Sequence, residues 1–329
     1  MRHGLRKKIA GMLLVAFARL TEIVMAQFAQ RTAERAWPPL IYTPLICMLV
    51  VWLTTRLFVG AQGSGVSQAI AAKRLAHQGK PVNGLVSLRI AFAKTSFGAQ
   101  ALIGGFPAGR ERTSVQVAAS IMHFFHRWLP DAQILRSENL ILAGGAVGIR
   151  QHSIRPWRRL HPVWFAGICG LVVAILGWLS GGMSFGSGYG ITSKVIASDI
   201  VLPWHAPITR FLATVVTYFS GIPGGIFAPS LTVVAAVSAN TAELFHLAAQ
   251  PTIALCMVGF LAAVTQSPIT SAIIVMEMID SHSMVISLMA VALIAKAISS
   301  RMGPELYQQL ARGFLESAEA ATKQKNPTQ

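Results

Sequence analysis

The chain has 329 residues, of which 53% are hydrophobic and only 12% are charged, whereas soluble domains usually carry about 25% charged residues. Because the apolar residues recur in runs along nearly the whole chain, the composition excludes a soluble protein and predicts one polytopic membrane domain. The formal net charge of +16 raises nucleic-acid binding as an alternative. The basic residues flank apolar segments and do not alternate with aromatic residues, which favours positive-inside membrane topology and no nucleic-acid partner.

The predicted helices begin near the N-terminus, where a basic stretch and apolar residues 9–17 lack a small-residue cleavage site and indicate a retained first helix. Segments 40–59 and 163–180 come close to the roughly 20 apolar residues that a helix needs to cross a bilayer core. Several of the later apolar segments are too short to cross it. These shorter or interrupted segments are 208–220, 227–247, 252–264, 269–278 and 284–298.

Glycine and proline concentrate in four clusters, at residues 60–65, 104–109, 181–190 and 221–229. In lipid, irregular backbone is tolerated only where it is packed in protein or lines a water-filled cavity, so broken helices are typical of a transport site. Two clusters fall in each half of the chain. We therefore expect an all-α, polytopic membrane fold with short broken helices and an inverted repeat.

Glycine-rich helix starts are the feature to seek in such a chain if it binds anions. Their free N–H groups and the helix dipole supply about half a positive charge, whereas a full charge at the bilayer midplane would hold an anion too tightly for release. The sequence has three candidates: GSGVS at 63–67, GRERT at 109–113 and GGIFAP at 224–229.

In this order and within a polytopic chain, the three motifs resemble the CLC family of chloride channels and chloride/proton exchangers, whose patterns are GSGxP, GREGP or GKEGP, and GxFxP. Residues 259–278, GFLAAVTQSPITSAIIVMEM, resemble the late helix pair of that family, and GPELY at 303–307 resembles its closing tyrosine segment. The resemblance covers about residues 40–149 and 155–310. It implies chloride transport by an all-α CLC-like fold, as a channel or a proton-coupled exchanger.

The resemblance implies a central chloride site with four contributors. Ser64 and Tyr307 would donate their hydroxyl groups to the ion, and the backbone amides of Ile226 and Phe227 would complete the shell. Without the resemblance, other interpretations stay open: Ser64 as a packing serine, Phe227 as a core or lipid-facing aromatic, and Tyr307 as an interfacial tyrosine.

The resemblance also implies that Glu111 is an external gate, beside the outer-site amides of Arg110 and Arg112. A carboxylate at a helix start is stabilised by the dipole that attracts chloride, so the two compete for one place and protonation couples to anion occupancy. The alternative is a helix-capping acid paired with a neighbouring arginine. Glu277 lies near Asp280 at the end of an apolar run. This position favours an interface-facing structural role for Glu277 over a proton relay.

The sequence departs from the family in two places. Arg112 and Thr113 stand where the family has Gly-Pro, and Ser67 stands where it has proline. After residue 150 the chain passes almost directly to RPWRR at 155–159, which resembles the loop before a much later family helix, so the fold is expected to be incomplete in the middle. The missing stretch would hold the internal proton-transfer glutamate and much of the dimerisation surface. Proton coupling and a homodimer are therefore open, and the alternative function is a truncated, inactive remnant with a structural or interaction role.

We accordingly expect a transmembrane chloride-transport domain at 1–310, with halves at about 1–150 and 151–310. Residues 311–329 are expected to form a short polar cytoplasmic tail without a regulatory domain. Chloride and the lipid bilayer are the expected partners, and a bacterial inner membrane is the expected location. No catalytic residue, metal site or cofactor is predicted, because the histidines and cysteines lack ligand spacing; the protein is not expected to be an enzyme.

Overall fold

The computed structural model describes residues 37–58, 86–109, 161–197, 202–281 and 283–303, with isolated positions between 19 and 32 and at 61, 65, 68, 71, 72, 120 and 200. Regular structure in these ranges is helical, which confirms the predicted all-α class. The helices are α2 (Pro39–Arg56), α4 (Leu88–Ile103), α7 (Pro162–Leu179), α8 (Tyr189–Ile196), α9 (His205–Ser220), α10 (Phe227–Leu244), α11 (Ala249–Thr265), α12 (Pro268–Ile279) and α13 (Val285–Met302).

Local sequence explains where several helices begin and end. Prolines 39, 162 and 268 are the first residues of α2, α7 and α12, where the missing N–H costs nothing because the first turn has no intrahelical acceptor. Ser87 caps α4 by accepting a hydrogen bond from the Ile90 amide at 3.3 Å. Gly221 ends α9 in the left-handed conformation, with φ of 82°, which glycine adopts without a steric penalty.

Among the described helices, α2, α7 and α13 are long and apolar enough to cross a membrane. The first two match the predicted segments 40–59 and 163–180. The third was expected to end at residue 298 but continues to Met302. Tertiary hydrogen bonds hold its last turn against α11: Ser299 Oγ donates to the Ala263 carbonyl at 2.5 Å, and Gln266 Nε2 donates to the Gly303 carbonyl at 2.9 Å.

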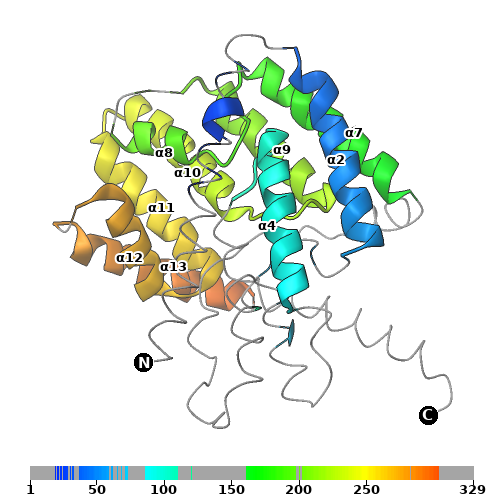
Figure 1. Ribbon diagram of the computed structural model, residues 1–329. Helices are drawn as coiled ribbons and strands as arrows, with labels where there is room; N and C mark the ends of the chain where they lie inside the picture. Colours follow the sequence, from blue (N-terminus) through cyan, green and yellow to red (C-terminus); the bar gives the residue numbers. More distant parts are fainter. Residues whose placement is uncertain are drawn as a thin grey trace, which may run out of the picture.

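One group of helices is formed by α2, α4 and α7, in which α2 and α7 lie side by side (Figure 1). Glycines allow the two backbones to approach closely: a Cβ atom on Gly170 would lie 2.7 Å from Pro44 Cα. Small residues serve the same purpose at helix contacts in membranes generally. The buried side chains of this group include Cys47, Val50, Val51, Ile90, Phe97, Ala166 and Val173.

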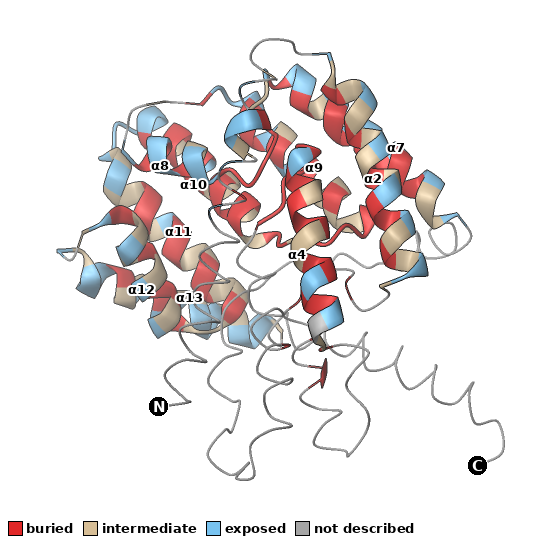
Figure 2. Cartoon of the chain, in the orientation of Figure 1, coloured by how far each residue is buried: buried red, intermediate tan, exposed pale blue. Residues whose placement is uncertain are grey.

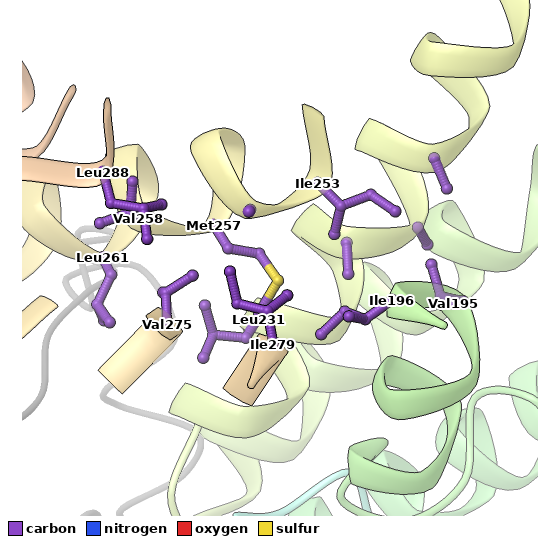
Figure 3. Close-up of a cluster of buried hydrophobic side chains, with 14 of the residues drawn as sticks. Val195, Ile196, Leu231, Ile253, Met257, Val258, Leu261, Val275, Ile279 and Leu288 are labelled. Atoms are coloured by element: carbon purple, nitrogen blue, oxygen red, sulfur yellow. The ribbon is translucent and has the colours of Figure 1, made fainter. Parts of the chain in front are cut away.

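The second group comprises α8 and α10 to α13, and α9 links it to the first by contacting both α7 and α10. Its core is a cluster of side chains that point toward one another between these helices (Figure 3). They include Val195, Ile196, Leu231, Ile253, Met257, Val258, Leu261, Val275, Ile279 and Leu288. Exposed residues line the outward faces of the helices (Figure 2), and many of them are large and apolar, as contact with lipid requires.

Candidate functional site

Two of the predicted glycine-rich segments meet in the structure. The Gly109 amide donates to the Gly225 carbonyl at 2.5 Å, and the Gly225 amide donates back to the Gly109 carbonyl at 2.9 Å. A Cβ atom on Gly224 would lie only 2.7 Å from Ala108 Cβ, so glycine is needed for this close approach. The second and third sequence motifs, one from each half of the chain, are thereby held together in antiparallel fashion.

The pairing lies at the start of α10. Ile226 precedes the helix, Phe227 is its first residue and Pro229 falls within its first turn, where proline costs little. Gly225 and Ile226 are buried, and within the described part of the chain no side chain caps this helix start, in contrast to α4. A buried and uncapped helix start presents amide N–H groups and the positive end of the helix dipole to whatever lies in front of it, which suits an anion.

The remaining predicted site residues, Ser64, Arg110, Glu111, Arg112 and Tyr307, lie outside the described residues, as does the predicted tail 311–329. The structure does describe two residues close to them in sequence, Gly65 and Gly303. Gly65 is buried with φ of 94°, and its amide donates to Gln68 Oε1 at 2.6 Å. Gly303 is held by Gln266 at the end of α13. The convergence of Ser64, Phe227 and Tyr307 on one chloride ion thus stays a prediction.

A cavity of about 160 Å³ lies between α9, α10 and α11. Ile226 borders both this cavity and the start of α10, but Phe227 does not line the cavity. The walls are mostly apolar and include no basic side chain, so the cavity suits an apolar occupant and is distinct from the predicted anion site. The lining residues are Phe211, Thr214, Val215, Tyr218, Ile226, Ser230, Val233, Val234 and Phe260.

Sequence reasoning missed two buried basic residues. Lys94 in α4 and Arg210 in α9 are 0% and 2% exposed, and each lies inside an apolar run, which is itself a signal of function in a membrane segment. The described acidic residues Glu243, Glu277 and Asp280 are all exposed. Because arginine stays protonated in proteins, the described interior carries positive charge without a buried carboxylate. The interface-facing structural role of Glu277 stays a prediction.

The described chain is thus a set of helices, three of them long and apolar enough to cross a membrane, in which two glycine-rich loops meet at the start of α10. The sequence model described as "Voltage gated chloride channel" matches residues 46–150 and 149–300. The chain therefore belongs to the voltage-gated chloride channel family, as its motifs predicted, and is an integral membrane protein. The two matched segments meet at residues 149–150, where the sequence predicts the junction.

Individual relatives differ in how much of each chain they share. The H(+)/Cl(-) exchange transporter ClcA of Salmonella typhimurium is 26% identical over 196 residues, which is 56% of this chain and 37% of the exchanger. The chain thus spans little more than a third of the length of that curated relative. An uncharacterized protein of Haemophilus influenzae is 43% identical over 67 residues, 20% of this chain and 68% of that protein.

Solved structures share the fold. A slow cyanobacterial Cl⁻/H⁺ antiporter superposes with a TM-score of 0.73 at 20% identity, covering 94% of this chain and 96% of that one. A CLC-type fluoride/proton antiporter superposes with a TM-score of 0.71 at 16% identity, covering 90% and 94%. These likenesses show that the chain has the helical CLC fold.

Proposed function

We propose that this protein moves chloride across a membrane through a passage that includes the start of α10, where the amides of Ile226 and Phe227 attract the anion. The pairing of Gly109 with Gly225 beside this buried, uncapped helix start carries the proposal. Two further observations support it. The described interior contains the buried charge of Arg210 and no buried carboxylate. Related proteins are described as chloride/proton and fluoride/proton antiporters. The bacterial relatives support a bacterial inner membrane as the location.

In this proposal Glu111 is the gate. It follows Gly109 by two residues, so chain connectivity limits its Cα to within about 7 Å of the Gly109 Cα. An ionised carboxylate at this place competes with chloride for the positive end of the helix dipole, whereas a protonated one does not. Acidification is therefore expected to open the passage. The amides of Arg110 and Arg112 would contribute to the outer part of the same site.

Ser64 and Tyr307 would donate their hydroxyl groups to the central chloride ion. A hydroxyl donor stabilises the ion without a permanent charge, which keeps binding weak enough for release. Proton exchange and association of two copies would depend on the central stretch that, from the resemblance, this sequence is expected to lack. We therefore propose anion permeation gated by protonation.

The alternative proposal is an inactive remnant that associates with an intact relative. The predicted loss of central helices is what supports this alternative, because helices that lack their usual neighbours would leave polar backbone groups without partners in lipid.

Chloride efflux from liposomes that contain the purified full-length chain separates the two proposals. Gated transport predicts an efflux that rises as external pH falls, and a Glu111→Ala variant whose efflux no longer depends on pH. Glu277→Ala is the matched control, because Glu277 is exposed on α12; it should keep the pH dependence. A folded, monodisperse protein without efflux would support the remnant.

A further inference from the structure

The guanidinium group of Arg210 is enclosed by main-chain carbonyl groups of a loop. Its Nη1 donates to the carbonyl of Met183 at 2.6 Å and more weakly to that of Phe185 at 3.4 Å, and its Nη2 donates to the carbonyl of Gly186 at 2.8 Å. All three acceptors belong to the glycine-rich segment between α7 and α8. A planar group with several fixed donors is needed to hold several carbonyls of one loop at once.

The sequence of this loop leaves room for the guanidinium group. Gly188 has φ of 82°, and a Cβ atom on it would overlap both Arg210 Nη2 and Thr232 Oγ1. The neighbouring Ser184 Oγ also donates to Thr209 Oγ1 on α9, at 3.0 Å. The loop is therefore attached to α9 at two successive residues, and the guanidinium group fits between the loop and α10.

The same loop is bound to the segment that leads to the candidate site. The Gly186 amide, whose residue also supplies an acceptor for Arg210, donates to the Gly105 carbonyl at 3.0 Å. On the other side, Thr43 Oγ1 in α2 donates to the Gly104 carbonyl at 2.8 Å. From Gly105 the backbone runs through three residues to Gly109, which pairs with Gly225. These hydrogen bonds and the short stretch of backbone between Gly105 and Gly109 thus connect the guanidinium group to the start of α10.

We propose that Arg210 is a positioning residue for anion binding: through Gly186 and Gly105 it sets the place of Gly109 against Gly225 and the start of α10. The inference rests on the proposed function and deepens it, since the arginine acts through the loop and does not touch the anion. Lysine cannot replace it, because one ammonium group on a flexible stem does not hold the carbonyls of Met183 and Gly186 in a fixed arrangement.

The test measures the chloride dissociation constant of the detergent-purified full-length protein by calorimetry, together with its melting temperature. Arg210→Lys keeps the charge and loses the geometry, so positioning predicts a dissociation constant raised about tenfold, the effect of losing one hydrogen bond to a charged group. A lysine variant with wild-type affinity would show that only the charge matters and would overturn the proposal. Arg301→Lys, at an exposed position of α13, is the control and should leave the affinity unchanged.

A second pair of variants keeps the arginine in place. In Gly188→Ala the added methyl group overlaps the guanidinium group. Gly182→Ala is the matched variant, because Gly182 has a similar φ of 89° and a methyl group there has no neighbour closer than 4.0 Å among the described residues. Both lose stability through left-handed strain. Positioning predicts weaker chloride binding for Gly188→Ala alone, and equal affinities would refute it.

Wild-type protein that neither binds nor transports chloride would overturn the proposed function and this inference with it. Wild-type binding with unchanged affinity in the Arg210 and Gly188 variants would overturn the inference only.

Discussion

Replacing Gly224 with alanine is expected to separate the two loops that form the candidate site. The new Cβ atom would lie 2.7 Å from Ala108 Cβ, whereas carbon atoms in ordinary contact lie about 3.5–4.0 Å apart, so the loops must move apart by about 1 Å. The hydrogen bonds between Gly109 and Gly225, now 2.5 and 2.9 Å long, would be lost or severely weakened. At about 1 kcal/mol each, two such bonds account for about 2 kcal/mol, or roughly a thirtyfold loss of the competent arrangement.

Chloride efflux from liposomes and calorimetric chloride binding measure this loss. The compensating variant combines Gly224→Ala with Ala108→Gly, which removes the described methyl group that the new side chain would meet. We expect the double variant to recover most of the lost affinity. Wild-type transport by Gly224→Ala, or a double variant no better than the single one, would refute the view that close approach of the loops creates the site.

Two further predictions concern the packing of the helices. Gly170→Ala should lower stability by about 1–3 kcal/mol, because its methyl group would lie 2.7 Å from the backbone atom Pro44 Cα. Gly190→Ala, whose methyl group would have no described atom within 4 Å, is the control and should cause no loss. Equal melting temperatures of the two variants in detergent would contradict the close contact of α2 with α7. Leu288→Ala, at a fully buried position of α13, should cost about 2–5 kcal/mol. Ile286→Ala, 85% exposed on the same helix, should cost under about 0.5 kcal/mol, and a reversed order would show that α13 packs through its other face.

The sequence by itself determined the class of protein, the family and several of the helix ends. Composition excluded a soluble fold, and the order of the glycine-rich motifs predicted the family that the comparisons confirm. Prolines 162 and 268 mark helix starts and Gly221 marks a helix end, because each acts through its own backbone within one turn of the chain. Signals of this range can be read without knowing what the segment packs against.

Only the tertiary structure decided which of these segments meet. The pairing of Gly109 with Gly225 joins residues from different halves of the chain. The carbonyl partners of Arg210 come from the loop before α8, which the whole of α8 and the segment after it separate from α9. The last turn of α13 likewise depends on hydrogen bonds from α11. Nothing within a few residues of any of these groups specifies its partner, because the partner is set by how the apolar faces of whole helices pack and by where glycine lets two backbones touch.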